Sequence, residues 1–116
     1  MLVLVCGSRA WQDSQAIADR FAKYPRGTVV LHGGASRGAD YLASLIAKTM
    51  GFSQEVMPAD WRRLGRGAGI IRNGQMLDRN PDVVLAFWDG SSPGTRHTIK
   101  EARRRGIPVE VVGGSH

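Results

Sequence analysis

Three glycine-rich turns in this chain carry the residue types that bind phosphate groups. The turn Gly33-Gly34-Ala35-Ser36-Arg37-Gly38 lies between the strand-like run Thr28–Leu31 and a helical pattern from Tyr41. In such a turn, backbone N–H groups can converge on an anion, and glycine lets a ligand approach the backbone closely. Similar turns occur at Gly7-Ser8-Arg9 and at Gly90-Ser91-Ser92-Pro93-Gly94-Thr95. Together they predict one composite phosphate site.

Polar side chains beside these turns could complete the site. Arg9 directly follows the first apolar run, where its guanidinium could reach the same pocket or lie on the surface. Asp40 lies three residues after Arg37 on the same helical face, and could accept from a ribose hydroxyl or favour the helix start electrostatically. In the third turn, hydroxyl groups join backbone N–H groups at a helix start that Pro93 can prepare. A purely structural role as tight turns stays open for all three.

Aromatic and basic residues outside the turns offer further contacts. Trp11 and Trp61 stand in polar loop sequences, where either could stack on a nucleobase or cover a hydrophobic edge. Arg72 and Asn73 lie together in a predicted helix that follows a polar, glycine-rich stretch at residues 58–67. Both could face the pocket, or both could face the solvent.

Alternating strand and helix patterns must position these residues. Continuous apolar runs predict buried parallel strands at residues 2–6 and 82–88, and further strands are expected at 28–31, 54–57 and 109–112. Helices are expected from 13 or 14 to 24, from about 41 to 51, from 68 to 79, and from about 96 to 105, with an irregular stretch at 58–67 and a frayed tail at 113–116. This order predicts an α/β fold, a Rossmann-like three-layer sandwich with a mostly parallel five-stranded sheet. All three turns would lie at the carboxyl ends of its strands, where such folds bind ligands.

Length and composition indicate a single domain over residues 1–116. The chain is 42% hydrophobic and 22% charged, contains one cysteine, and has no apolar run of the roughly 20 residues that a membrane span needs. No Cys/His cluster has zinc spacing, and the run Met1–Cys6 is too short for a signal peptide. We therefore expect a cytoplasmic protein with no dedicated metal site, to which a phosphate ligand could still bring magnesium.

The net charge of +6 comes almost entirely from arginine, with 13 Arg and 3 Lys. Arginine suits bidentate phosphate recognition and base stacking, although a GC-rich coding sequence would give the same bias. The run Arg103-Arg104-Arg105 fits a helix end, where positive charge is favourable, better than a nucleic-acid patch.

Short motifs along the chain also match a known group of proteins. They are Gly7-Ser8-Arg9, His32-Gly33-Gly34-Ala35 with Gly38-Ala39-Asp40, Ala59-Asp60-Trp61, Ala68-Gly69 with Arg72-Asn73 and Met76, and Ser92-Pro93-Gly94-Thr95. In this order the chain resembles the SLOG superfamily, which includes the DNA-processing protein A and Lonely Guy families. More narrowly, nearly the whole chain resembles the YspA or cpYpsA-related subgroup of bacteria and phages. The resemblance implies a Rossmann-like domain that binds nucleotides or nucleotide-derived ligands.

Lonely Guy-type phosphoribohydrolases, which cleave the base from nucleoside 5′-monophosphates, are more distant relatives by this resemblance. Arg72 occupies the place of their catalytic arginine, and Gly94-Thr95 matches their glycine-threonine pair. Their catalytic glutamate would fall at Thr98, which cannot supply a carboxylate, and Glu101 lies almost a further helical turn away. Those relatives pair through helices beside the active site, so the resemblance also implies a homodimer or a higher homo-oligomer.

We therefore predict a nucleotide-binding protein that acts as a sensor or a sequestering protein. The phosphate would lie on the N–H groups of Gly33–Gly38 and Gly94-Thr95 beside two arginines, with Asp40 on the ribose and Trp61 on the base. The predicted ligand-binding residues are Gly7, Ser8, Arg9, Gly33, Gly34, Ala35, Arg37, Gly38, Asp40, Asp60, Trp61, Arg72, Asn73, Ser91, Ser92, Gly94 and Thr95. For an enzyme, Arg72 and Glu101 are the candidate catalytic residues.

Two other functions stay open. A nucleotide hydrolase would cleave the N-glycosidic bond or a phosphate ester, using Asp40, Asp60 or Glu101 in an unfamiliar arrangement. Binding of single-stranded DNA would show a steep salt dependence and needs arginines gathered on one face. In the sequence the arginines are spread along the whole chain.

Overall fold

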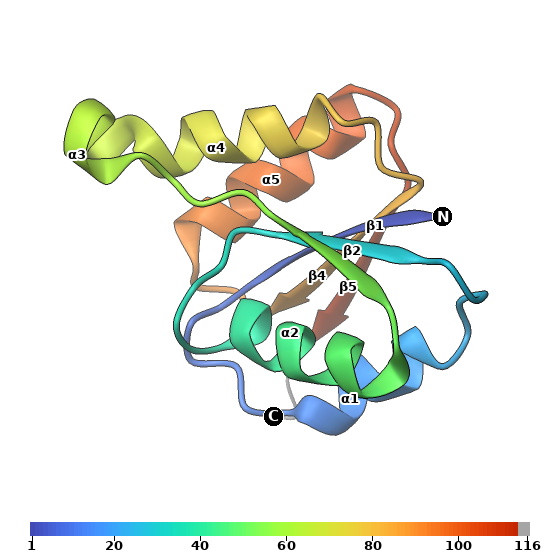
Figure 1. Cartoon of the computed structure of the whole chain (residues 1–116). Coiled ribbons are helices and arrows are strands. Elements are labelled where there is room, and N and C mark those ends of the chain that lie inside the picture. The colour runs from blue at the N-terminus through green and yellow to red at the C-terminus, as the bar shows by residue number, and fades with distance from the viewer. Residues whose placement is uncertain (114–116) are drawn as a thin grey trace.

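A parallel sheet forms the centre of the molecule. The structure is a computed structural model that describes residues 1–113, with the backbone alone at residue 66. Its strands are β1 (Leu2–Gly7), β2 (Val29–His32), β3 (Ser53–Val56), β4 (Val83–Trp88) and β5 (Val109–Gly113), in the order β3-β2-β1-β4-β5 (Figure 1). Every neighbouring pair is parallel. The predicted α/β, Rossmann-like fold is confirmed, and the described strands are parallel throughout rather than mostly parallel.

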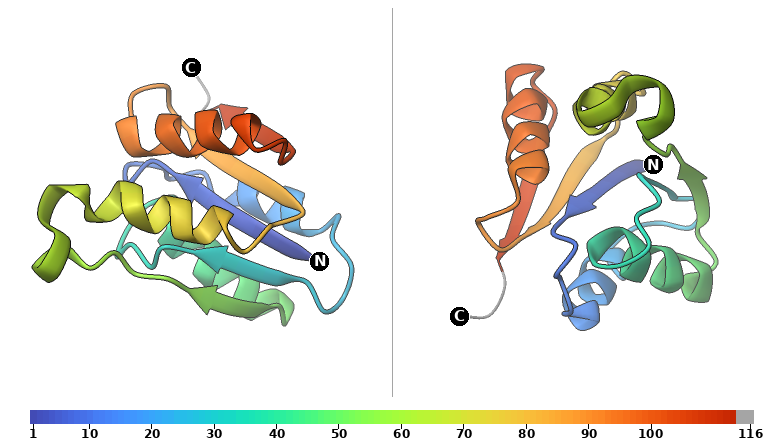
Figure 2. Two further views of the ribbon diagram at one scale, coloured as in Figure 1. Left: turned by 90° about the horizontal axis from the view of Figure 1, so that it is seen from above. Right: turned by 90° about the vertical axis from the view of Figure 1, so that its left-hand side faces the viewer.

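Helices cover both faces of this sheet, so the three-layer arrangement is also confirmed. Helices α1 (Ser14–Phe21) and α2 (Ala39–Met50) lie on one face, and α4 (Ala68–Leu77) and α5 (Pro93–Arg104) lie on the other (Figure 1, Figure 2). The chain first builds outward from β1 to β3 and then returns to add β4 and β5 on the other side of β1. The loops after β1 and β4 therefore diverge, which leaves a crevice at the carboxyl ends of the central strands.

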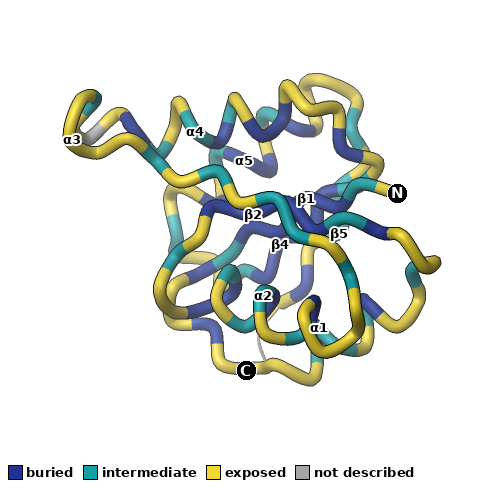
Figure 3. The backbone as a smooth tube through the Cα atoms, viewed as in Figure 1, coloured by how far each residue is buried: buried dark blue, intermediate teal, exposed yellow. Residues whose placement is uncertain are grey.

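Alternation along the central strands divides the core into two layers. Val3 and Val5 of β1 belong to the cluster under α1 and α2, whereas Leu4 and Cys6 belong to the cluster under α4 and α5. The buried strand residues form the dark band through the middle of Figure 3. A parallel sheet with helices on both faces requires apolar side chains on both sides of its strands, which explains the unbroken apolar runs in the sequence.

The stretch at residues 58–67, expected to be irregular, contains a short helix α3 (Trp61–Leu64) and a 3-10 turn (Gly65–Gly67). Asp60 starts α3 because its Oδ1 accepts from the N–H of Arg63 at 3.3 Å, as an N-cap residue does. The prediction was wrong here because one helical turn has too few residues to show an apolar period. This segment projects beyond the carboxyl ends of the strands (Figure 1).

Other boundaries differ by a few residues. Helix α1 ends at Phe21 rather than at Tyr24, and the following peptide groups form turns before Pro25. Helix α5 begins at Pro93, a position where a missing N–H costs nothing. Of the expected tail, Gly113 belongs to β5 and residues 114–116 lie outside the described part. Within residues 1–113, no helix combines the length and the apolar character needed to cross a bilayer.

Candidate functional site

A cavity of about 900 Å³ opens at the carboxyl ends of the strands. The loops after β1, β2 and β4 form its walls together with α3 and α4. We call it the carboxyl-edge cavity. It brings together most of the predicted ligand-binding residues, namely Gly7, Ser8, Arg9, Gly33, Gly34, Ala35, Arg37, Asp40, Trp61, Arg72, Asn73, Ser91, Ser92, Gly94 and Thr95. The three turns therefore border one cavity.

Arg72 reaches from α4 across the end of the sheet and lies over Gly33. Its Nη1 donates to the carbonyl oxygen of Gly33 at 3.2 Å and lies 3.5 Å from that of Met57. A Cβ atom at Gly33 would lie 2.6 Å from the guanidinium carbon of Arg72, so a larger residue would displace the arginine. Arg72 therefore faces the cavity rather than the solvent, and it also holds the glycine turn in place.

Side chains of the protein engage the N–H groups of the turn Gly33–Ala35. The N–H of Gly34 donates to Nδ1 of His32 at 3.0 Å, and Nε2 of His32 lies 2.9 Å from Oε1 of Gln54. Because Nδ1 accepts, a neutral imidazole carries its proton on Nε2 and donates it to Gln54. This ring orientation supports Gly34 in its left-handed conformation, with φ of 73°.

Asp40 reaches the same turn from the first turn of α2. Its Oδ2 accepts from the N–H of Ala35 at 3.4 Å. Burial raises the pKa of Asp40, while His32, the Ala35 N–H, Arg72 and the Gly33 N–H each lower it and offset burial only in part. The carboxylate thus lies where a phosphate was expected to meet this turn.

The start of α5 forms the opposite wall. Ser92 is its N-cap residue, with Oγ 3.0 Å from Thr95 Oγ1 and 3.5 Å from the Thr95 nitrogen. Asn73 donates through Nδ2 to the carbonyl oxygen of Gly94 at 3.4 Å, which connects α4 to this turn. Since Gly94 lies in the first turn of the helix, its N–H has no acceptor within the helix, and the positive end of the helix dipole is directed to this side.

Two further arginines stand at the rim of the cavity. Arg9 and Arg37 are both exposed, and no carboxylate of residues 1–113 lies within ion-pair distance of either. Burial lowers the pKa of Arg72, and the positive charge of Arg9 lowers it further, although Asp40 opposes both. Like charges that face one cavity favour an anion between them.

The tryptophans of the polar loops have different environments. Trp11 is buried, packs against Phe87 at a ring-centroid distance of 5.6 Å, and donates through Nε1 to the Asp13 carbonyl at 2.9 Å. Trp61 is 51% exposed at the cavity, and its ring would lie 3.2 Å from a Cβ atom at Gly69. Trp11 therefore covers a hydrophobic edge, whereas Trp61 presents an aromatic face to the cavity.

Two of the predicted ligand-binding residues lie outside the lining of the cavity. Gly38 has φ of 80°, and a Cβ atom there would lie 2.6 Å from the backbone carbonyl carbon of Arg9. Its role in the structure is to let the turns after β1 and β2 pack together. Asp60 caps α3, as described above.

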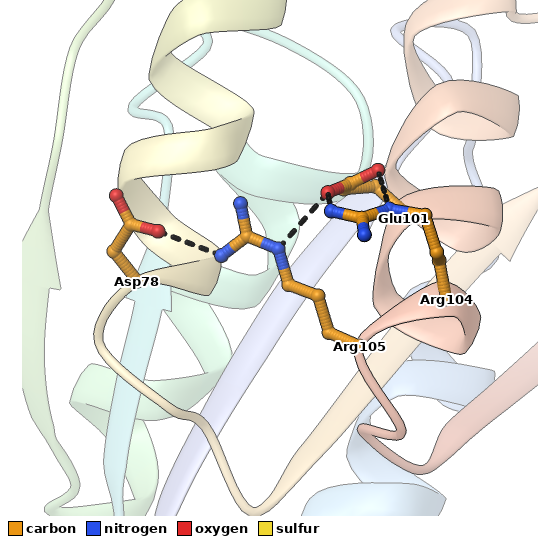
Figure 4. A network of polar contacts seen from close by, with 4 residues as sticks. All are labelled: Asp78, Glu101, Arg104 and Arg105. Atoms are coloured by element: carbon orange, nitrogen blue, oxygen red, sulfur yellow. Dashed lines mark hydrogen bonds and ion pairs between the residues drawn. The ribbon is translucent and has the colours of Figure 1, made fainter.

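Glu101 also lies outside the cavity lining, near the far end of α5. Its Oε1 pairs with Nη2 of Arg104 at 2.5 Å and with Nε of Arg105 at 3.1 Å, and Nη1 of Arg105 reaches Asp78 at 2.7 Å (Figure 4). The hydrogen bonds from Arg104 and Arg105 lower the pKa of Glu101 to about 2. Among the candidate carboxylates for a hydrolase, only Asp40 lines the cavity.

Sequence reasoning missed Asp89 and Cys6, which also line the cavity. The Oδ1 of Asp89 accepts from the N–H of Ser91 at 2.9 Å and from its hydroxyl at 2.8 Å, and these bonds lower the pKa of Asp89. Asp89 directly follows an apolar run, as Arg9 does, and this position was the signal that could have found it. Cys6 is buried at the end of β1, and burial raises the pKa of its thiol.

Comparison with known proteins finds similarity to one protein family and to a phage protein. The model of the YspA, cpYpsA-related SLOG family matches residues 1–64, which contain the first two glycine turns and Trp61. The Gene 61 protein of Mycobacterium phage D29 is 47% identical over 116 residues, covering 92% of each chain.

Proposed function

The chain belongs to the YspA, cpYpsA-related SLOG family. We propose that it binds a nucleotide or a nucleotide-derived ligand in the carboxyl-edge cavity. Membership of this family implies a nucleotide-related ligand in general. The specific role we propose is that of a cytoplasmic sensor or sequestering protein, which holds its ligand without converting it.

One observation carries this proposal, namely the convergence of positive charge and hydrogen-bonding groups in the cavity. Arg9 and Arg72 face the same space, and the first turn of α5 contributes the N–H of Gly94 and the hydroxyls of Ser92 and Thr95. Guanidinium groups and a helix N-terminus together match the charge and the acceptor oxygens of a phosphate. We place the phosphate of the ligand there.

The rest of the cavity suits the nucleoside part. The exposed ring of Trp61 can stack on a base, an interaction worth about 1–3 kcal/mol. Asp40 can accept from a ribose hydroxyl. Thr98, at the position of the glutamate in Lonely Guy-type relatives, lines the cavity but donates its hydroxyl to the Gly94 carbonyl at 3.1 Å. This bond favours binding over hydrolysis.

A thermal-shift screen tests the proposal directly. The panel contains nucleoside mono-, di- and triphosphates, cyclic nucleotides, NAD and ADP-ribose, and each hit is recovered and examined by mass spectrometry. A ligand at 100 times its Kd adds about 2.7 kcal/mol of stability, a shift of roughly 10 °C for a domain of this size. A ligand recovered intact supports binding alone, whereas free base plus sugar phosphate identifies a hydrolase. A screen without any hit contradicts the proposal.

Arg9→Ala is the variant that tests the phosphate position. Arg9 is exposed and has no carboxylate partner among residues 1–113, so its loss leaves the fold unchanged. Loss of one charge-assisted hydrogen bond to a phosphate weakens binding by about 1.5–3 kcal/mol, or roughly 10- to 100-fold. Arg103→Ala, at the far end of α5, is the matched control and keeps the affinity of the unmodified chain. If calorimetry gives both variants the same affinity for the ligand, the proposed position of the phosphate is contradicted.

A second candidate function, binding of single-stranded DNA, is favoured by the placement of the unpaired arginines. Arg9, Arg37, Arg62 and Arg96 are exposed and belong to the segments that follow β1, β2, β3 and β4. These four arginines lie at one edge of the sheet, whereas Arg26 and Arg103, which are also exposed, lie at the opposite edge. A basic edge around a cavity large enough for a nucleotide would suit the binding of the end of a single DNA strand.

We also propose that the protein forms a homo-oligomer. Trp61, Ile70 and Ile71 expose apolar side chains on α3 and α4, and their burial between copies would be favourable. Sedimentation at increasing protein concentration tests this, and a constant monomer mass contradicts it.

A further inference from the structure

The carboxylate of Asp40 occupies a position that the backbone has prepared for an anion. The N–H of Ala35 donates to it at 3.4 Å, and the N–H of Gly33 also lowers the pKa of Asp40 as a hydrogen-bond donor. Successive N–H groups around a glycine with positive φ form the concave arrangement that binds phosphates in other proteins. Between Gly33 and Ala35, the N–H of Gly34 donates to His32 at 3.0 Å. The N–H groups of Gly34 and Ala35 are therefore engaged within the protein.

The two walls of the cavity consequently differ in hydrogen-bonding capacity. The wall at the start of α5 offers the N–H of Gly94, which has no acceptor within the helix, and it also carries the carboxylate of Asp89. The wall at the Gly33–Ala35 turn offers the carboxylate of Asp40, and the N–H groups of Gly34 and Ala35 are engaged there within the protein. Arg72 lies between the two walls and is attracted to Asp40.

We propose that Asp40 determines ligand specificity, because its carboxylate fills the anion position of the Gly33–Ala35 turn and so admits only an uncharged or hydrogen-bond-donating part of the ligand there. A phosphate oxygen brought to the same N–H groups would have to displace this carboxylate or lie within a few ångströms of it. Like charges at such distances repel strongly in a partly buried site.

This assigns a class of ligand to the cavity. The ligand carries its anionic group at one end, for the α5 wall, and hydroxyl or amino groups at the other, for Asp40. A nucleoside monophosphate has this distribution, whereas a ligand with phosphates at both ends does not. The assignment rests on the proposed function, but the role of Asp40 in excluding anions from the turn can be tested without any nucleotide.

The test uses inorganic phosphate as the probe and the intact chain labelled with ¹⁵N. Amide resonances are followed as phosphate is added to the unmodified protein, to Asp40→Asn and to Asp89→Asn. Asparagine keeps the shape and an acceptor oxygen at position 40 but removes the charge. The Asp89 variant removes a carboxylate from the same cavity that does not contact the Gly33–Ala35 turn.

We expect phosphate to shift the amides of Gly34 and Ala35 in Asp40→Asn with an affinity at least about tenfold higher than in the unmodified protein or in Asp89→Asn. Equal affinity in all three proteins, including no binding in any of them, overturns the inference. Dispersed amide spectra before titration show that each variant is folded. A nucleotide screen without hits contradicts the proposed function but leaves this comparison intact.

Discussion

At the scale of the residue, the ionisation of Asp40 affects the stability of the folded protein. Its pKa is raised, chiefly by burial, so the folded protein holds this proton more tightly than the unfolded chain does. The folded protein therefore loses relative stability as pH rises from the ordinary aspartate range through the folded pKa. We expect Asp40→Asn to raise the Tm at pH 7 by a few degrees, and the gain to shrink as pH is lowered toward about 4. A lower Tm at pH 7 contradicts this account.

Asp89→Asn is the matched control, and its expected change in Tm at pH 7 has the opposite sign. The N–H and hydroxyl of Ser91 hydrogen-bond the ionised Asp89 and lower its pKa. The ionised carboxylate therefore stabilises the fold above the ordinary aspartate pKa, and this stability is lost as pH falls through the lower, folded pKa. Thermal unfolding of Asp89→Asn should show a lower Tm at pH 7, and the deficit should vanish in acid.

Residue types after apolar runs were enough to identify most of the cavity lining, because strand ends and helix starts place such residues at one edge. What they could not show is which groups neutralise one another. Arg72 and Asp40 are 32 positions apart in the sequence, and their attraction exists only after α2 and α4 pack on opposite faces. Glu101 was a reasonable candidate by sequence distance from Thr95, but the helix carries it to Arg104 and Arg105.

At the scale of the element, the start of α5 both stabilises the fold and forms a wall of the cavity. Ser92 caps this helix through its hydroxyl. Removal of such a cap costs about 1 kcal/mol, so Ser92→Ala should lower the Tm by roughly 4 °C. Ser91→Ala is the control, because the hydroxyl of Ser91 bonds Asp89 in the exposed loop and not the helix. Equal losses for the two variants in calorimetric unfolding would mean that the loop, rather than the cap, is responsible.

Caps and apolar periods also explain which elements the sequence predicts. The predicted cap of α1 is present, since Oδ1 of Asp13 accepts from the N–H of Ala16 at 3.0 Å. The central strands β1 and β4 were expected from apolar runs, because burial on both faces leaves no room for polar alternation. The edge strand β3 was expected as a short strand, although its sequence is largely polar. Helix α3 was missed because its cap, Asp60, stands alone without a period to follow it.

At the scale of the whole molecule, the fold gives some arginines a carboxylate partner and leaves others without one in the described part of the chain, although they are spread along the whole sequence. Near the ends of α1, α4 and α5, Arg20, Arg79, Arg104 and Arg105 pair with carboxylates. Arg9, Arg37, Arg62 and Arg96, which follow the first four strands, form no ion pair with the described side chains of residues 1–113, and neither do Arg26 and Arg103 at the opposite edge. No local pattern encodes this difference, since it depends on which elements meet.

The placement of these four arginines gives the second candidate function, binding of single-stranded DNA, a quantitative test. If Arg9, Arg37, Arg62 and Arg96 each neutralise one phosphate of a single strand, the logarithm of the binding constant should fall with the logarithm of salt concentration with a slope of about −2.8. Fluorescence anisotropy of a labelled oligothymidylate of about 20 nucleotides measures this slope. Arg62→Ala should reduce its magnitude by about 0.7, whereas Arg103→Ala, at the opposite edge of the sheet, should leave it unchanged. A slope that changes equally in both variants would mean that net charge alone attracts the DNA strand. Absence of binding at low salt would contradict DNA binding as a function.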